Sequence, residues 1–184
     1  MPRADARRNY ERLLAAARRA FTEQGVTASL DDIARAAGVG SGTLYRHFPS
    51  RDRLILELMR ESLDGLTRLA PALAAEHPPA EALTRWLDAY SAHAAGFRGL
   101  AATLVTTDLD PDDPSMLACH DAQAAGRALV SAAIATGDVD PATDPQDVLD
   151  LAAAVAWIIE QAPRGDDQRQ RLLAVTVRGI ASDG

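Results

Sequence analysis

The sequence contains no lysine, so all 19 of its basic residues are arginine. Arginine pairs bidentately with phosphates and with guanine edges, a property useful to a protein that binds nucleic acid. The plainer interpretation is the coding bias of a GC-rich genome, and we prefer it. The missing lysine therefore does not decide the function by itself.

Cysteine and long apolar runs are also scarce. Cys119 is the only cysteine, which excludes an intrachain disulfide and a cysteine-rich zinc site. The longest apolar run, LAAAVAWII at residues 151–159, is too short to span a bilayer. The N-terminal stretch MPRADARRNYERL lacks the apolar core of a signal peptide. We therefore expect a soluble protein in the cytoplasm.

Strand-like patterns and aromatic residues are few. Aromatic residues make up 4% of the chain, and no long stretch alternates between apolar and polar residues as a half-buried strand does. Apolar residues reach 47%, with alanine abundant, and 184 residues are enough to bury a core. We predict an all-α protein of one sizeable domain or two small ones.

The net charge of −7 alone argues against a nucleic-acid partner, but the charges are unevenly distributed. Residues 1–60 contain 11 arginines and 7 acidic residues, a balance of +4. Residues 61–184 contain 8 arginines and 19 acidic residues, a balance of −11. This asymmetry indicates a basic binding module on an acidic body.

Two amphipathic helices are predicted near the start of the chain. The first covers about residues 4–24, with apolar residues at helical spacing, and Gly25 is placed to end it. The second covers about residues 30–37, where Ser29 followed by Asp32 forms the capping-box pattern that begins a helix.

The stretch AGVGSGTLYRHF, residues 37–48, joins the second helix to a third. Gly38 closes the second helix, the next glycine lies in the turn, and Ser41 can cap a third helix over about residues 42–48. A phosphate-binding glycine loop would need a preceding strand and a third glycine, and Thr43 stands in that place. The spacing predicts a helix-turn-helix unit.

Longer helices follow, separated by proline-rich or acidic breaks. Ser50 caps the first of them, and their expected ranges are about 50–74, 80–106, 115–136, 146–162 and 166–182. We place the domain boundary after residue 50, between a helix-turn-helix domain at residues 1–50 and a helical domain at residues 51–184.

Residues 7–60 resemble the DNA-binding domain of the TetR/AcrR family of transcriptional regulators. The matching residues are LLAAARRAFTEQG and then ASLDDIARAAGVGSGTLYRHFPSRDRLI, which keep the family spacing across three helices and into a fourth. The stretch GDVDPATDPQDVLDLAAAVAWI resembles the C-terminal half of some actinobacterial-type members. The resemblance implies an N-terminal three-helix DNA-binding domain and a C-terminal helical ligand-binding and dimerisation domain.

The third helix has residues suited to reading DNA. A helix in the major groove needs small or polar residues at its leading end, and Ser41, Gly42 and Thr43 have that character. Thr43 can bond a base or touch a thymine methyl group. Arg46, one turn later, is our candidate for contacting guanine O6 and N7. The alternative is that Arg46 is solvated or contacts only phosphate.

Other residues are expected to contact the DNA backbone. The resemblance implies phosphate contacts for Tyr45 and His47, and it places Arg51 where the family commonly has a lysine. The amide end of the second helix, with Thr27 and Ser29, should hold another phosphate. The alternatives are a packing role for Tyr45 and a plain surface position for His47.

The last two predicted helices are candidates for a homodimer interface. The stretch VLDLAAAVAWII is apolar nearly all round, so we expect both its faces to be buried, and RLLAVTVRGI is almost as broad. The third helices of the two copies would then bind the two halves of a palindrome, roughly 34–36 Å apart or a multiple of that. The alternative is a pair of central core helices in a monomer.

The expected helix over residues 80–106 carries an aromatic stripe that includes polar groups. A mostly apolar pocket with a few polar anchors is the usual ligand site, although such a stripe is ordinarily core. The expected lining residues are Trp86, Tyr90, His93, Phe97, His120, Gln123 and Trp157. The effector would be small and partly apolar, and the resemblance implies that its binding changes the spacing of the two third helices.

Two other functions fit the sequence less well. Catalysis is disfavoured because Cys119 and His120 are adjacent and do not face each other on a helix. The sequence DLDPD at residues 108–112 imitates a calcium loop, but Asp113 stands where glycine is needed. We expect neither cofactor nor metal. The other rival is a helical protein-binding adaptor without DNA binding, which the intact polar face of the third helix disfavours.

Overall fold

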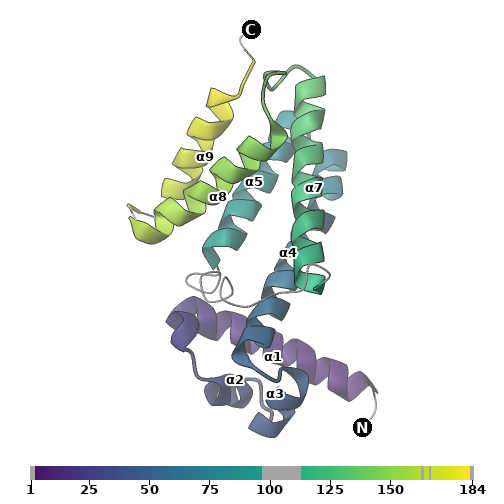
Figure 1. Ribbon diagram of the computed structural model, residues 1–184, viewed down its shortest axis with the longest axis vertical. Coiled ribbons are helices and arrows are strands. Elements are labelled where there is room, and N and C mark those ends of the chain that lie inside the picture. Colours follow the sequence, from purple (N-terminus) through teal and green to yellow (C-terminus); the bar gives the residue numbers. More distant parts are fainter. Residues whose placement is uncertain (1–2, 97–112, 163, 166, 183–184) are drawn as a thin grey trace. The chain divides into compact units, whose positions relative to one another are not determined.

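The computed structural model (Figure 1) describes residues 3–96, 113–162, 164–165 and 167–182. These residues are helical apart from turns and one isolated β-bridge, which confirms the all-α prediction. The described chain divides into two compact units, with residues up to Glu61 in the first and residues from Ser62 onward in the second.

The helices predicted for the first unit are all present. In its described part the elements are α1 (Arg3–Gln24), the 3₁₀ turn η1 (Gly25–Thr27), α2 (Leu30–Ala36), α3 (Ser41–His47) and α4 (Arg51–Glu76). The helix α4 is continuous and contributes residues to both units. Its Ser50 cap is confirmed, because the Ser50 hydroxyl accepts a hydrogen bond from the Arg53 amide at 3.2 Å.

Glycine ends the first two helices, as the sequence predicts. Gly25 and Gly38 have φ angles of +63° and +66°, the left-handed conformation that side chains with a Cβ adopt at a cost. One cap was predicted wrongly. Gly40, not Ser41, is the N-cap of α3, and Ser41 is the first residue of the helix. Its hydroxyl donates instead to Asp31 Oδ1 at 2.7 Å.

The core of the first unit joins all four of its helices. Large side chains from each helix are almost completely buried there, among them Leu13, Phe21, Ile33, Leu44, Phe48, Leu54 and Ile55. Leu44 and Phe48 are the two residues of the third helix that were expected to face inward. Because they fix one side of α3 against the core, the opposite side of this helix is left to solvent.

The second unit is a bundle in which α5 packs against α7, α8 and α9. The bounds of these helices are α5 (Pro79–Gly96), α7 (Pro114–Ala135), α8 (Pro145–Gln161) and α9 (Gln168–Gly179). Both α7 and α8 begin with proline after a capping aspartate, Asp113 or Asp144. The part of the predicted fifth helix beyond Gly96 and most of the acidic loop lie outside the described residues.

Trp86 is the central side chain of the second core. It is fully buried, and its Nε1 donates to the Leu66 carbonyl of α4 at 3.0 Å. Its ring also lies so close to Gly126 of α7 that a Cβ there would be 2.5 Å from the ring. The same Cβ would lie 3.2 Å from Leu149 of α8. Trp86 therefore joins α5 to α4 and α7, and the absence of a side chain at Gly126 makes room for it.

The turn between α8 and α9 is held by a buried side chain. Gln168 is 2% exposed, accepts a hydrogen bond from the Arg164 amide and donates to the Ala162 carbonyl. An ion pair of 3.0 Å between Arg169 and Asp88 attaches the start of α9 to α5. These contacts set the direction of α9 along α8.

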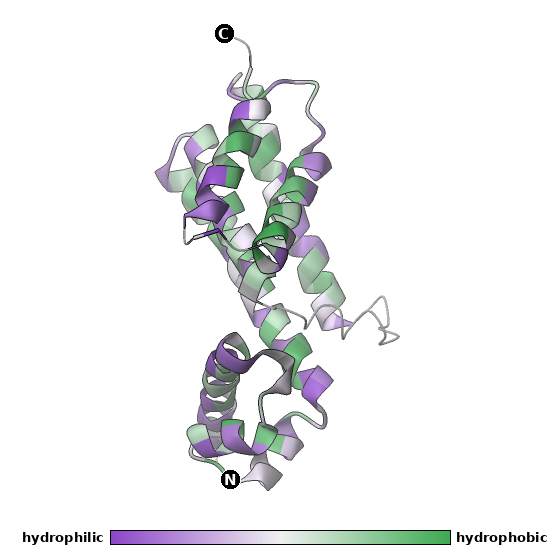
Figure 2. Ribbon diagram, turned by 90° about the vertical axis from the view of Figure 1, so that its left-hand side faces the viewer, coloured by the Kyte–Doolittle hydropathy of each residue, from purple (hydrophilic) through white to green (hydrophobic). Residues whose placement is uncertain are grey.

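Hydropathy follows the packing. In Figure 2, hydrophilic and hydrophobic positions share the same helices, as expected for amphipathic helices that each bury one side. None of the helices in the described part of the chain combines the length and the apolar character needed to cross a membrane.

Candidate nucleic-acid interface

The first unit contains a helix-turn-helix whose turn is closed by local hydrogen bonds. The Gly38 amide donates to the Arg35 carbonyl and the Val39 amide to the Ala34 carbonyl, each at 3.0 Å. The guanidinium of Arg12 on α1 lies over this turn, and a Cβ on Gly38 would be 2.3 Å from its Nη2. Glycine is thus favoured here by the backbone conformation, and a Cβ would also require the flexible end of Arg12 to move.

The outward side of α3 is small and polar. Gly42, Tyr45 and Arg46 are exposed, whereas Ser41 and Thr43 are half-buried. Tyr45 is 48% exposed, too much for a residue whose main role is packing. This side therefore presents a backbone that can be closely approached at Gly42 and polar side chains one turn further on.

Arg46 is held along the leading end of α3. Its Nε donates to the Gly42 carbonyl at 3.2 Å, and its Nη2 donates to Thr43 Oγ1 at 3.1 Å. A guanidinium has five N–H donors, so these two bonds leave donors to spare. Within the described chain it has no acidic partner. The charge and the remaining donors can therefore bind an acceptor outside the protein.

His47 is partly a packing residue. Its ring lies edge-on to Tyr10 of α1, with 6.0 Å between centroids, and 6.2 Å from the Phe48 ring. Tyr10 also stacks on Phe48 at 5.3 Å. The C-terminal end of α3 thus packs on an aromatic side chain from α1.

A cluster that sequence reasoning missed extends this contact to α4. The Tyr10 hydroxyl donates to Glu57, which also pairs with Arg60. Burial, and then the hydrogen bond to Glu57, raise the pKa of Tyr10 to about 12. Burial acts to raise the pKa of Glu57, but hydrogen bonds from Arg60 and Tyr10 outweigh it and lower that pKa. No spacing rule links residues so far apart in the sequence.

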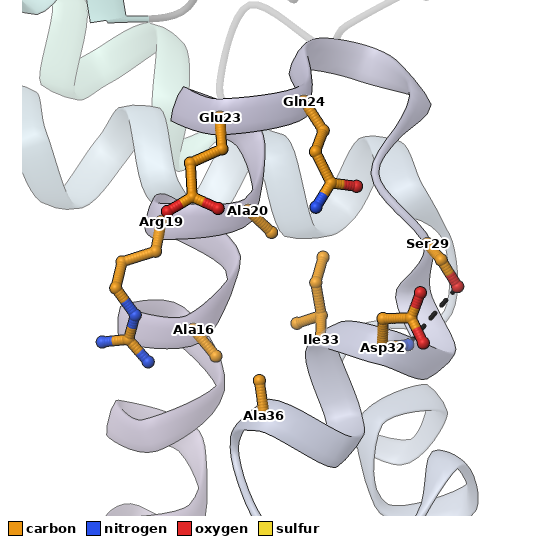
Figure 3. Close-up of a pocket in the computed structure, with 9 residues that line it drawn as sticks. All are labelled: Ala16, Arg19, Ala20, Glu23, Gln24, Ser29, Asp32, Ile33 and Ala36. Atoms are coloured by element: carbon orange, nitrogen blue, oxygen red, sulfur yellow. Dashed lines mark hydrogen bonds between the residues drawn. The ribbon is translucent and has the colours of Figure 1, made fainter.

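The predicted phosphate site at the start of α2 has a well-defined local structure. Ser29 Oγ accepts from the Asp32 amide at 3.3 Å, as the capping pattern predicts (Figure 3). Thr27 Oγ1 donates to the Gln24 carbonyl at 2.8 Å. Arg51 donates to the Ala28 carbonyl at 2.6 Å and so braces the segment that enters α2. Thr27, Ser29 and Arg51 therefore all belong to one fixed corner of the unit.

A shallow hollow of about 170 Å³ lies between α1 and α2 (Figure 3). Its walls carry the small or branched side chains of Ala16, Ala20, Ile33 and Ala36, and charged residues such as Glu23 line its edge. The short side chains let the two helices approach closely. The hollow lies beside the helix-turn-helix and does not involve α3.

In the second unit, the structure brings together some of the expected ligand residues. The rings of Trp86 and Tyr90 stack with 5.1 Å between centroids and an interplanar angle of 12°. Burial raises the pKa of the Tyr90 phenol, and a hydrogen bond with Gln123 opposes that shift. His93 Nδ1 lies 2.6 Å from Ser62 Oγ of α4. Tyr90, Gln123 and His93 therefore place polar groups around α5.

Other expected ligand residues lie elsewhere. His120 is exposed, and Trp157 is 63% exposed on the outward side of α8, so the structure does not join either to this group. Phe97 lies outside the described residues. Sequence reasoning missed Ser91 of α5, which is fully buried and whose Oγ has no hydrogen-bond partner among the described residues. The described chain also has no group of three metal-ligating side chains.

Family models match both units. Residues 13–58 match the model for bacterial regulatory proteins of the tetR family, and residues 78–182 match the model for the C-terminal domain of SbtR-like transcriptional regulators. Curated relatives include an HTH-type transcriptional regulator of Staphylococcus aureus, 40% identical over 63 residues. That match spans about a third of each chain, 34% in both cases.

Solved structures match over almost the whole length. A TetR transcriptional regulator from Streptomyces coelicolor is 36% identical with a TM-score of 0.74, covering 95% of this chain and 99% of that one. A TetR transcription regulatory protein from Mycobacterium vanbaalenii is 30% identical with a TM-score of 0.73, covering 98% and 99%. Together with the exposed polar face of α3, these matches show that the chain belongs to the TetR family of transcriptional regulators, which bind DNA and are not enzymes.

Proposed function

We propose that this DNA-binding regulator is a homodimeric repressor that binds a palindromic operator and is released by a small, partly apolar ligand. The observation that carries the proposal is the outward side of α3, where Tyr45 and Arg46 are exposed while Leu44 and Phe48 are buried in the core. A helix fixed on one side and polar on the other is what major-groove reading requires.

The proposed DNA contacts divide into two kinds. Arg46 and Thr43 read base edges, with Ser41 and Gly42 allowing the leading end of α3 to enter the groove. Backbone contacts position the protein and come from Thr27, Ser29, Tyr45, His47 and Arg51. This division predicts that base contacts change sequence preference, whereas backbone contacts change affinity for all sequences alike.

A second copy of the chain is the proposed partner of α8 and α9. Leu151 and Trp157 of α8 are 49% and 63% exposed, and Val175 of α9 is 58% exposed. Ala154 is exposed between the two α8 residues. Apolar residues gathered on the outward sides of adjacent helices mark an interaction surface, and two such helices from each copy would form a four-helix interface.

The proposed ligand group is the polar set around α5, namely Tyr90, Ser91, His93 and Gln123. The buried and unpartnered Ser91 Oγ supports this, because a buried polar atom is normally hydrogen-bonded. A ligand that competes for His93 would act on its contact with Ser62, and therefore on α4, which belongs to both units. The ligand-free protein represses if its two α3 helices already have the spacing that the operator requires.

The domain boundary and the location are part of the same proposal. The proposed DNA-binding domain is residues 1–50, and residues 51–184 form the ligand-binding and dimerisation domain. The first part of α4, as far as Glu61, packs in the core of the DNA-binding unit. The protein acts in the cytoplasm, where bacterial DNA is found. It requires no cofactor.

Selection of duplexes from a random pool at near-physiological salt tests the proposal. We expect the unmodified protein to enrich a palindrome, and the double variant Tyr45→Ala plus Arg46→Ala to lose it. Arg68→Ala, which removes an exposed arginine of α4 in the second unit, is the matched control and should enrich the same palindrome. Failure of a proven dimer to enrich any sequence, with and without cell extract of small molecules, would favour the protein-binding adaptor.

A further inference from the structure

A carboxylate lies at the leading end of the recognition helix, where DNA phosphates would be expected to repel it. Asp31, in the first turn of α2, accepts a hydrogen bond of 2.7 Å from the hydroxyl of Ser41, the first residue of α3. Asp31 is exposed and Ser41 is half-buried. The neighbouring Asp32 has a different partner, Arg35 of its own helix, at 2.7 Å.

Asp31 and Ser41 together can accept further hydrogen bonds but cannot donate any. A serine hydroxyl has one proton and two acceptor lone pairs, and a carboxylate only accepts. Since Ser41 donates its proton to Asp31, the pair has only lone pairs left to offer. Lone pairs cannot bond to phosphate oxygens, guanine O6 and N7 or thymine O4, which are themselves acceptors. The groups in the major groove that can bond to them are the amino groups of cytosine N4 and adenine N6.

The other polar pair on α3 has the opposite character. The Arg46 guanidinium donates to Thr43 Oγ1 and to the Gly42 carbonyl, and its remaining groups are donors. The leading part of α3 therefore presents an acceptor group beside a donor group. A groove surface complementary to both has an exocyclic amino group next to guanine O6 and N7.

We infer that Asp31 and Ser41 form a specificity-determining pair, which selects cytosine at one position of each operator half-site, because the adenine amino group lies beside the N7 acceptor that the carboxylate repels. The inference rests on the proposed function, because it requires α3 to lie in the major groove. The carboxylate also repels phosphates at every sequence, so it lowers non-specific binding while a matching amino group offsets the repulsion at the operator.

The variant Asp31→Asn separates this role from a merely structural one. An asparagine Oδ1 still accepts the Ser41 proton, so the contact between α2 and α3 is kept, while the new amide group adds two donors. Asp32→Asn is the matched control, because it removes the same charge from the adjacent residue without touching Ser41. Both variants and the unmodified protein would be put through the same random-pool selection.

The expected result is confined to one base pair. Asp31→Asn should lose roughly tenfold in preference for cytosine at one symmetric position and accept guanine, thymine or adenine there, because an asparagine amide can also bond to adenine N6 and N7. Asp32→Asn should keep the preference at that position. Identical preferences for the unmodified protein and Asp31→Asn at every position would overturn the inference and leave Asp31 as a structural contact between helices.

A second measurement tests whether the amino group of this base is contacted. In the selected duplex, cytosine at that position is replaced by 2-pyrimidinone, so that the amino group alone is removed. The unmodified protein should lose roughly tenfold in affinity, and Asp31→Asn should lose little. Equal losses for both proteins would overturn the inference. If the unmodified protein enriches no sequence at all, the proposed function itself fails, an outcome distinct from either of these.

Discussion

The outward sides of α3 and α8 can be compared directly, because each helix buries its other side in the core of its own unit. On α3 the exposed residues are glycine, tyrosine and arginine, whereas on α8 they include Leu151, Ala154 and Trp157. On each helix, burial within the chain accounts for the apolar residues of the inward side. It does not account for the residues of the outward side. On the proposed function, the outward residues match their partners: hydrogen-bond donors on α3 for DNA, and apolar area on α8 for a second copy of the chain.

The largest expected effect comes from placing a charge on the α8 surface. Trp157→Arg should weaken self-association by about 30-fold or more, because the proposed dimer would lose an interface aromatic and bury a charge in its place. Since Trp157 is exposed in the single chain, the helical content should not change. Sedimentation equilibrium with circular dichroism measures both.

Ala128→Arg is the matched control for that variant, since Ala128 is exposed on a different helix, α7. It should remain a dimer. If Trp157→Arg associates as strongly as the unmodified protein, α8 is not the dimer interface. Its exposed apolar residues would then not indicate a protein partner.

The turn before α3 can be broken without touching its exposed side. Gly38→Ala should destabilise the protein by about 1–2 kcal/mol, because alanine is strained at positive φ and its Cβ would displace Arg12. Gly65→Ala is the matched control, because Gly65 lies inside α4, has no positive φ and has no atom within 4 Å of the added Cβ. Urea unfolding compares the two. Equal destabilisation by both would refute the requirement for glycine at residue 38.

The cluster behind α3 should give the protein a specific response to high pH. The pKa of Tyr10 is raised to about 12 in the folded protein, above the ordinary tyrosine value near 10. The hydroxyl's contribution to stability is thus complete below about pH 10 and is lost as the pH rises toward 12. Tyr10→Phe should be less stable than the unmodified protein at pH 8, by about 1 kcal/mol.

The measurement is the difference in unfolding free energy between the two proteins at a series of pH values. It should shrink between pH 10 and 12. A difference that stays constant over this range would show that Tyr10 titrates at its ordinary pKa. Tyr45→Phe is the control, because Tyr45 is exposed and lies outside the cluster of Tyr10, Glu57 and Arg60.

The helix-turn-helix could be predicted from the sequence because its signals are local. Gly25 and Gly38 end helices, Ser29 and Ser50 begin them, and each acts within a few residues. Ser41 shows where such signals fail. Its position indicated a cap, but α3 begins one residue earlier with Gly40 as the N-cap, so Ser41 is the first helical residue. There its hydroxyl donates to the Asp31 carboxylate of the preceding helix, a contact that no spacing rule includes.

The second unit was harder to predict for a related reason. The sequence of α8 is apolar nearly all round, so its pattern does not mark which side faces the core, and Trp157 was expected at a ligand pocket. In the structure it is exposed. Contacts such as the one between His93 and Ser62 depend on how α5 lies against α4, which only the folded chain determines.

The central claim is that the outward side of α3 reads DNA sequence. It is tested most directly by the ratio of affinities for the selected palindrome and for a scrambled duplex of equal length, measured for the unmodified protein and Arg46→Ala at one salt concentration. The account predicts that the ratio falls roughly tenfold or more in the variant, with a much smaller change on the scrambled duplex. An equal loss on both duplexes would contradict it, because Arg46 would then contact only the phosphate backbone.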